Sequence, residues 1–350
     1  MGRPSPWWAK PAQANRRGSC EVRGVQKQHS QKQVQRMKAV RFHEFGGPEV
    51  LRYEDVNQPV PGAGQVRIRV AATSFNGVEG NIRAGFMQGP IPVELPHTPG
   101  IDVAGTVDEL GTDVKDLAVG DRVIGFLPMT GTGAAAEYVL APAEILTGAP
   151  KGIPLADAAA LPVVGLTAWQ ALFDHGNLVA GQRVLINGAG GAVGGYAVQL
   201  AKEAQARVVA VVGPGDGDRV EAAGADEVID HTTSDVAALV TEQLDLVLNL
   251  APVTPEQLAA FVPLIRDGGA LVNTTVWMPA PSDEQRGVRG IDLYVRSDAD
   301  QLADLAARVS TGELKVEVAK RVPLEKLPEV HSLAAAGSLP GKTVITISTD

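Results

Sequence analysis

A cluster of small residues between an apolar run and a helical pattern is the stretch of this sequence best suited to chemistry. Residues 183–187 predict a strand, and residues 196–202 predict a helix. Between them, Ala189-Gly190-Gly191-Ala192-Val193-Gly194 matches the G-x-G-x-x-G dinucleotide fingerprint, with alanine in the first glycine position. We expect Gly191 to let the backbone approach a pyrophosphate and Gly194 to let the helix pack against the strand. Because a helix N-terminus also presents unpaired N–H groups to phosphates, the pattern predicts a dinucleotide-binding turn.

Two different patterns flank this turn and predict two domains of an α/β protein. Residues 37–160 hold short alternating segments broken by Gly and Pro, which predicts a β-rich, barrel-like domain beginning with a strand at Met37. Strands then alternate with helices, which predicts a doubly wound parallel sheet. In this second part we expect strands at 207–212, 227–230, 244–250, 269–274 and 291–295, and helices at 156–161, 167–173, 217–223, 234–243, 255–265 and 299–311. A last strand within residues 341–347 could return to the first domain.

The charge of the chain is distributed unevenly. The net charge is −9, yet residues 1–36 carry eight basic side chains and a single acid, Glu21. This segment lacks apolar periodicity and predicts a disordered basic tail. Such a tail could bind RNA or a membrane surface, or target an organelle, although we favour an upstream extension with no folded role.

Cysteine content and hydropathy limit the location of the protein. The single cysteine, Cys20, leaves no disulfide and no cysteine-rich metal site, which favours a reducing cytoplasm. The apolar runs are far shorter than the ~20 residues that span a bilayer, so we expect no membrane span.

Short motifs recur in a fixed order along the chain. They are FGGPEVL at 45–51, Asn76, PGIDVAGTV at 99–107, VGDRV at 119–123, LP at 161–162, GLTA at 165–168, the fingerprint, GAD at 224–226 and GKTV at 341–344. In this order the chain resembles the medium-chain dehydrogenase/reductase superfamily, in its zinc-free quinone oxidoreductase-like (enoyl reductase-like) branch. The resemblance implies a GroES-like catalytic domain of residues 37–163 and 313–350, with a Rossmann NADP-binding domain of residues 164–312 inserted. We also expect a homodimer.

The same resemblance bears on metal binding. In the zinc alcohol dehydrogenases, the position of Asn76 holds a cysteine ligand, and a Gly-His-Glu motif corresponds to Gly100-Ile101-Asp102. An isoleucine side chain cannot coordinate a metal. The chain also lacks the four cysteines of a structural zinc lobe. We therefore expect no zinc.

Without a Lewis acid, neutral hydrogen-bond donors would have to stabilise the charge that hydride addition places on an oxygen. The candidates for this role are Asn76, near the nicotinamide, and Asn81, where several relatives carry a tyrosine. Tyr138 is a weaker candidate, and the final proton is expected to come from solvent. Glu79 and His97 are expected to be structural, with Glu79 pairing with Arg83 one helical turn later.

The residues expected to hold the cofactor follow from the fingerprint and from the strand ends. The second strand of the sheet continues into Gly213 with no acid at its end, and Arg219 is the nearest base, with Asp216 and Asp218 close by. We expect NADPH because the strand-end acid is missing and because the family favours NADPH. NADH is the less favoured alternative. The remaining expected contacts are Thr167, Asn249, Val272, Asn273 and Lys342. Asn249 could instead be a strand-end turn residue.

The resemblance therefore implies a zinc-independent, NADPH-dependent reductase of quinones or of α,β-unsaturated carbonyls. An enoyl reductase of secondary metabolism is the near alternative, since pocket shape decides and Phe86, Met87, Trp277 and Met278 lie in variable loops. A non-catalytic, cofactor-binding or RNA-binding member of the family is the alternative from another class, supported by the basic tail alone.

Overall fold

The structure is a computed structural model that describes residues 35–275 and 277–348. The expected basic tail, apart from Gln35 and Arg36, lies outside the described residues. Arg36 already begins the first strand, one residue before the expected start at Met37.

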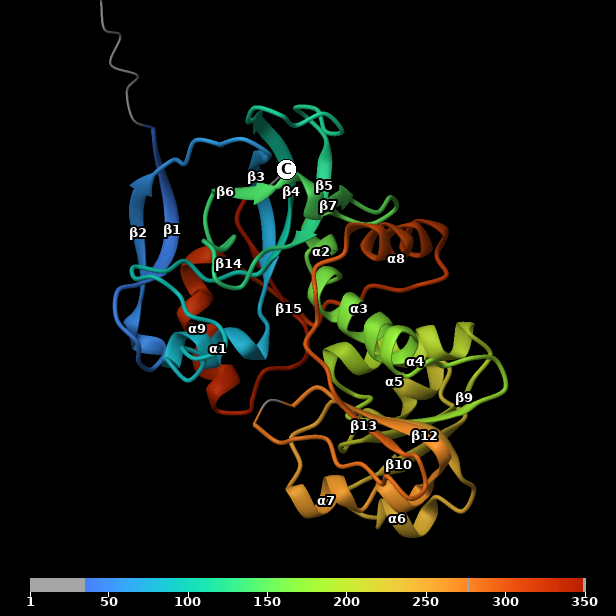
Figure 1. The fold of residues 1–350 in the computed structure, drawn as a ribbon. Coiled ribbons are helices and arrows are strands. Elements are labelled where there is room, and N and C mark those ends of the chain that lie inside the picture. The colour runs from blue at the N-terminus through green and yellow to red at the C-terminus, as the bar shows by residue number, and fades with distance from the viewer. Residues whose placement is uncertain (1–34, 276, 349–350) are drawn as a thin grey trace, which may run out of the picture. The chain divides into compact units, whose positions relative to one another are not determined.

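A six-stranded parallel sheet forms the lower half of the view in Figure 1. Its strand order is β10-β9-β8-β11-β12-β13, which is the 3-2-1-4-5-6 order of a Rossmann fold. The strands are β8 (Arg183–Asn187), β9 (Arg207–Val212), β10 (Glu227–Asp230), β11 (Leu244–Asn249), β12 (Ile265–Asn273) and β13 (Arg289–Asp292). The reversal of strand order therefore falls between β8 and β11, where a ligand crevice is expected in this class of sheet.

Helices cover both faces of this sheet. The helices are α3 (Pro162–Trp169), α4 (Ala192–Glu203), α5 (Gly217–Ala222), α6 (Val236–Leu239), α7 (Pro255–Ala259) and α8 (Ala299–Thr311). Val184 and Ile186 of β8 belong to the apolar cluster that includes α3, α4 and α8. Leu185, which points the opposite way along the same strand, packs in the cluster that includes α7. The sheet is therefore apolar on both sides, as its nearly continuous run of hydrophobic residues predicts.

The β-rich part consists of a seven-stranded sheet and a separate β1-β2 pair. The strands are β1 (Arg36–Phe42), β2 (Leu51–Asn57), β3 (Gln65–Ser74), β4 (Asp102–Leu110), β5 (Arg122–Phe126), β6 (Tyr138–Pro142), β7 (Leu146–Gly148), β14 (Lys320–Pro323) and β15 (Thr343–Thr346). Helices α1 (Gly77–Ala84), α2 (Leu155–Ala158) and α9 (Leu327–Ala335) accompany them. This is the GroES-like domain that the resemblance implies.

The C-terminal strands β14 and β15 join the sheet that the first part of the chain forms. β15 pairs antiparallel with β3, with Val344 opposite Ser74, and β14 pairs with β15 (Figure 1). The last strand thus returns to the first domain, as the sequence suggested. The domain boundaries at 163/164 and 312/313 stay a prediction.

Helix ends differ most from the sequence expectation. The helix expected at 167–173 begins earlier, at Pro162, because proline is well suited to the first turn, and a π-helical turn follows at 170–175. The expected helix 255–265 ends at Ala259, and a short 3-10 turn containing Pro263 then leads into β12. Proline has no N–H for a helical hydrogen bond, which accounts for the early end. No helix among the described residues is long and apolar enough to cross a membrane.

Substitutions at two adjacent glycines of α4, Gly194 and Gly195, can show how tightly this helix packs against the turn before it. A Cβ at Gly194 would lie 2.4 Å from the carbonyl oxygen of Gly188, whereas a Cβ at Gly195 would have nothing closer than 3.8 Å. We expect Gly194→Ala to lower the free energy of unfolding by about 1–3 kcal/mol through overpacking. Gly195→Ala should be neutral or slightly stabilising, because alanine favours helix. Thermal unfolding of the two variants measures the difference, and equal Tm values would contradict the packing described.

Candidate active site

A cleft of ≈ 500 Å³ opens where the β-rich domain meets the carboxyl ends of the parallel strands. Its walls are mainly apolar. The β-rich domain contributes Phe75, Met87 and Met129, and the Rossmann domain contributes Leu250 and Val295. Thr167 of α3 also lines it, with its hydroxyl donating to the carbonyl of Val163 at 2.7 Å. A planar, apolar molecule would displace water here with little loss of hydrogen bonds.

The fingerprint turn forms the floor of this cleft. Gly188, directly after β8, has a φ of 87° and makes a sharp turn one residue before Ala189, the first position of the fingerprint. Ala189 itself is fully buried. Gly191 lines the cleft, and a Cβ there would meet the oxygen of Gly188 at 3.3 Å and no other described atom within 4 Å. The open space over Gly191 lies directly at the N-terminus of α4, and such a space fits the diphosphate of a dinucleotide.

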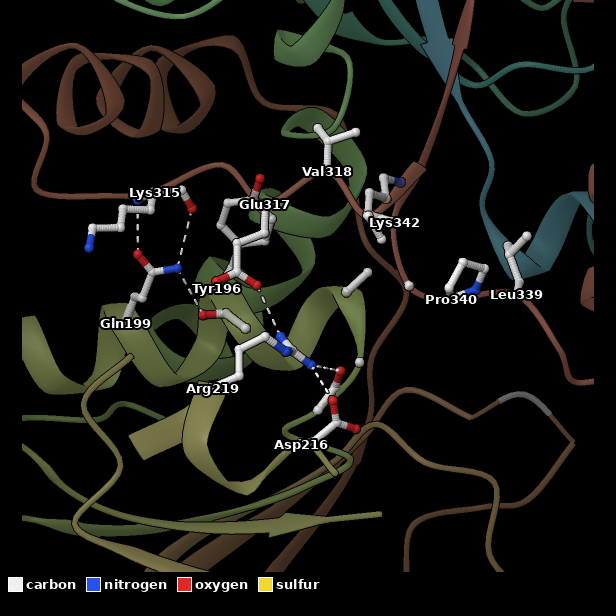
Figure 2. A pocket seen from close by; sticks show the side chains of 16 residues that line it. Tyr196, Gln199, Asp216, Arg219, Lys315, Glu317, Val318, Leu339, Pro340 and Lys342 are labelled. Carbon is white, nitrogen blue, oxygen red and sulfur yellow. Dashed lines mark hydrogen bonds and ion pairs between the residues drawn. The ribbon is translucent and has the colours of Figure 1, made fainter. Parts of the chain in front are cut away.

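A second cavity of ≈ 830 Å³ adjoins the cleft along α4. Gly191, Ala192, Gly341 and Lys342 line both spaces, so the two adjoin at the fingerprint turn. Figure 2 shows Arg219 in this second cavity, with Asp216 and Glu317 on either side of its guanidinium. A dinucleotide held at the fingerprint turn would have a space on either side of it.

Asp102 of β4 is the centre of a buried polar cluster at the edge of the cleft. Its carboxylate is fully buried. The groups that donate to it are the Ser74 hydroxyl, the Asn76 amide at 2.8 Å, the Lys342 ammonium at 3.2 Å and the backbone N–H of Val163 at 2.8 Å. Val163 lies in the first turn of α3, where a carboxylate is favoured by the unpaired N–H groups and the helix dipole. Asp102 therefore connects β3, the start of α1, the start of β15 and α3.

Lys342 is the charge partner of Asp102 and is 4% exposed. Its ammonium group also donates to the side-chain oxygen of Asn76 at 2.8 Å and to the carbonyl of Phe75 at 3.3 Å. The three donors of an ammonium group are thus all engaged. Lys342 lines the cleft, but its charge points into the cluster, and its role as a cofactor contact stays a prediction.

Asn76 lies on the cleft wall, directly before α1. Its amide nitrogen donates to Asp102 and, at 3.3 Å, to the carbonyl of Ser74. Both N–H directions of the side chain are therefore already used inside the cluster.

Glu79 has different partners from those expected. Its carboxylate accepts the backbone N–H groups of Asn76, Gly100 and Ile101, and no bond to Arg83 is present among the described contacts. Arg83 instead contacts the Gly46 carbonyl and His331. The prediction of a Glu79–Arg83 pair is therefore wrong. The Glu79 side chain points back toward the start of α1 and binds the backbone of residues 100–101. Burial raises the pKa of Glu79 to about 7, although the backbone N–H groups oppose this rise.

Three asparagines form a ladder across the carboxyl ends of β8, β11 and β12. Asn187 donates to Asn249 at 2.7 Å, and Asn249 donates to Asn273 at 2.9 Å. The strand register places each directly opposite the next. Asn249 and Asn273 thus lie at strand ends, as expected, but their side chains bond to one another and hold the loops that border the cleft.

The other predicted residues lie in different places. Gly190, Ala192, Val193, Gly194 and Arg219 line one or both cavities. Gly213 and Val272 do not line them, although they flank the site at the ends of β9 and β12. Asn81 lies on α1 outside both cavities. Tyr138 lies on β6, where Arg67 stacks over its ring at 5.5 Å, and it lines a different depression. The structure therefore brings Asn76 into the cleft but neither Asn81 nor Tyr138.

Several residues of the site were missed by the sequence analysis. They are Gly188, Asp102 in its bonding role, Asn187, Glu317 and the cleft residue Tyr294. A glycine directly after an apolar strand was a usable signal for Gly188. Asp102 and Lys342 are separated by 240 residues, so no local pattern could pair them.

The fold and the site together define a class of protein. A Rossmann sheet joined to a GroES-like domain, with a dinucleotide turn opening into the cleft between them, is the architecture of the medium-chain dehydrogenases/reductases, which are oxidoreductases. This fold implies a nicotinamide cofactor site, and the fingerprint turn fits one.

Comparison with known proteins supports and narrows this class. Residues 62–151 match the model of the alcohol dehydrogenase GroES-like domain, and residues 223–345 match that of a zinc-binding dehydrogenase family. The chain is 32% identical over 324 residues to a chloroplast envelope quinone oxidoreductase homolog of Arabidopsis thaliana, covering 88% of this chain and 98% of that protein. It is 31% identical over 330 residues to a human quinone oxidoreductase, covering 89% and 98% of the two chains.

A solved structure agrees with these relatives. The quinone oxidoreductase of Coxiella burnetii superposes with a TM-score of 0.83 at 28% identity, over 90% of this chain and all of that one. The chain belongs to the quinone oxidoreductase-like branch of the medium-chain dehydrogenase/reductase superfamily.

The buried cluster around Asp102 can be tested through stability. Asp102→Ala would leave the Lys342 ammonium buried without its carboxylate, and breaking a buried pair in this way typically costs about 3–5 kcal/mol. Urea unfolding should show a loss of this size. The matched control is Glu242→Ala, which removes one partner of the Arg207–Glu242 pair, where both side chains are 62% exposed. A loss in the control as large as in Asp102→Ala would contradict the role assigned to burial.

The fingerprint turn can be tested through cofactor binding. We expect Gly191→Val to abolish NADPH binding while the protein still folds, because a branched side chain would fill the open space over Gly191 and its Cβ would press on one atom of the turn, the Gly188 oxygen at 3.3 Å. Gly80→Val is the matched control, since its Cβ would meet nothing within 4 Å. Calorimetric titration with NADPH and a thermal melt distinguish the variants. Unchanged affinity in Gly191→Val would place the cofactor elsewhere.

Proposed function

We propose that this protein is a zinc-independent quinone reductase that uses NADPH. The observation that carries the proposal is the apolar cleft continuous with the dinucleotide turn. When bound, the reduced nicotinamide supplies a hydride. The quinone oxidoreductases among the relatives support a small-molecule substrate of that class.

The walls of the cleft suit a flat, conjugated substrate. Phe75 and the flexible side chains of Met87 and Met129 can adapt to ring systems of different outline. Their role is to orient the ring over the turn and to exclude water from the reacting atoms. A quinone needs little further assistance, because the negative charge formed on its oxygen is delocalised over the ring.

Independence from zinc is supported by the chemistry of the residues. Ile101 has no donor atom, and Asn76 is a poor zinc ligand. The Lys342 ammonium also lies 2.8 Å from the Asn76 oxygen and 3.2 Å from Asp102, so a cation would meet an existing positive charge. Within the described residues, no group of three or more His, Cys, Asp or Glu side chains could hold a metal. The residues therefore do not fit a catalytic zinc site, whatever the name of the matching family model.

Asn76 is the proposed contact to the substrate oxygen, because it alone of the three predicted donors lines the cleft. To donate to a substrate, its amide must release Ser74 or Asp102. The longer bond, 3.3 Å to the Ser74 carbonyl, is the one that yields more easily. The single proton that completes the reduction after hydride transfer comes from solvent in this proposal.

NADPH is the proposed cofactor and NADH the less favoured alternative. Arg219 supports the choice, since it lies beside the fingerprint in the second cavity and can bind a 2′-phosphate. The end of β9 also carries no acid within the strand.

A homodimer and a cytoplasmic location complete the proposal. Among the described strands, β13 is at the edge of its sheet and pairs only with β12. Tyr294, next to it, is 73% exposed. An open edge beside an exposed aromatic side chain supports pairing with a second copy. The cytoplasmic location is supported by the single cysteine alone, and two of the related plant proteins are named chloroplastic.

A substrate panel tests the function directly. We expect NADPH oxidation with 1,2-naphthoquinone, weaker turnover of enones and enals, and no inhibition by chelators. Asn76→Ala should lower kcat on enones by less than the roughly 10²–10³ typical of a well-organised oxyanion donor, and on quinones by less still. Asn81→Ala is the matched control and should retain wild-type kcat. Turnover of enones alone would favour the enoyl reductase alternative, and no turnover with any acceptor would favour a non-catalytic member of the family.

A further inference from the structure

Arg219 is held by three acceptors in the second cavity. Its guanidinium donates to the Gly190 carbonyl, to Asp216 at 2.8 Å and to Glu317 at 3.0 Å (Figure 2). All three charged side chains are partly exposed, at 37–48%. Two carboxylates therefore share one guanidinium at the rim of the cavity.

The position of Arg219 makes this arrangement functionally important. It contacts the fingerprint turn and lies on α5, directly after the loop that follows β9. In Rossmann folds this is the region of the adenosine ribose, where a carboxylate binds the 2′-hydroxyl and an arginine binds a 2′-phosphate. A guanidinium binds phosphate well because its N–H groups match the spacing of the oxygens. Here those N–H groups already face carboxylates.

Glu317 reaches Arg219 from a distant part of the chain. It lies 98 residues after Arg219, in the segment between α8 and β14. Gln199 of α4 holds this segment by accepting the Lys315 N–H at 2.8 Å and donating to the Lys315 carbonyl at 3.3 Å (Figure 2). The Glu317 carboxylate is therefore presented to Arg219 by a backbone that is itself fastened to the Rossmann domain.

We propose that Glu317 sets the choice between NADPH and NADH by competing with the 2′-phosphate for Arg219. This inference rests on the proposed use of a nicotinamide cofactor. A 2′-phosphate must replace Glu317 at the guanidinium and also approaches two carboxylates, whereas a ribose 2′-hydroxyl can donate to either of them. Glu317 thereby weakens binding of the phosphorylated cofactor and leaves NADH unpenalised, so the preference for NADPH is smaller than Arg219 alone would give.

Two adenosine fragments test the proposal without turnover. 2′,5′-ADP differs from 5′-AMP only by the 2′-phosphate, so calorimetric Kd values for the two isolate its recognition. We expect Glu317→Gln to tighten 2′,5′-ADP roughly fivefold to tenfold at low ionic strength, with 5′-AMP unchanged within twofold. In an Arg219→Gln background, the same Glu317 substitution should have no effect on either fragment, because the two residues act as a pair.

Glu313→Gln is the matched control for charge alone. Glu313 lies on the same segment, is exposed and makes no described bond to Arg219. It should leave both fragments unaffected. The proposal is overturned if Glu313→Gln tightens 2′,5′-ADP as much as Glu317→Gln does. It is also overturned if Glu317→Gln tightens both fragments equally or tightens neither, or if the wild-type protein binds neither fragment.

The role of Glu317 and the proposed quinone reductase activity can fail independently of each other. If fragment selectivity changes as expected while the full-length protein turns over no quinone or enone, the assignment of Glu317 stands and quinone reduction is rejected. If NADPH-dependent turnover is present and the fragments fail to respond to Glu317→Gln, the reductase stands and the role of Glu317 is rejected.

Discussion

The buried carboxylate of Asp102 is the interaction on which the arrangement of the site depends. It neutralises Lys342, accepts the N–H of Val163 at the start of α3 and orients Asn76 on the cleft wall. α3 and α4 pack on the same face of the Rossmann sheet, so this one carboxylate links the β-rich domain to the helix layer beside the fingerprint. A buried ion pair contributes little net stability when compared with well-packed apolar side chains, but loss of one partner leaves an uncompensated buried charge. The cleft is positioned by charge pairing as well as by packing.

The sequence was sufficient for the parts of the structure that depend on local pattern. β9, β10 and α8 have the bounds expected from residue type, because apolar alternation and capping residues act over a few positions. The dinucleotide turn was also evident, since its glycines are adjacent in the chain. Helix ends such as that of α7 were less predictable, because a proline-containing turn and the following strand compete for the same residues.

The candidate catalytic residues were the least predictable part. Asn81 and Tyr138 have suitable side chains, yet α1 and β6 carry them away from the cleft. Whether a polar side chain faces a substrate depends on contacts between distant segments, and these leave no local signal. The pairing of Arg219 with Glu317 is of the same kind, because the two meet only after the chain has completed α8 and returned along α4.

The asparagine ladder has a directional consequence. Each amide donates toward β12, from Asn187 to Asn249 and from Asn249 to Asn273. Rotating the Asn249 amide by half a turn would set two N–H groups face to face on one side and two oxygens on the other and break both bonds of the ladder, whereas rotating Asn187 or Asn273 would break one. The same amides hold two loops beside the cleft, because Asn249 also donates to the Ala251 carbonyl after β11 and Asn273 donates to the Thr275 and Met278 carbonyls after β12. A change in the orientation of the Asn249 side chain would therefore be felt by both loops at once.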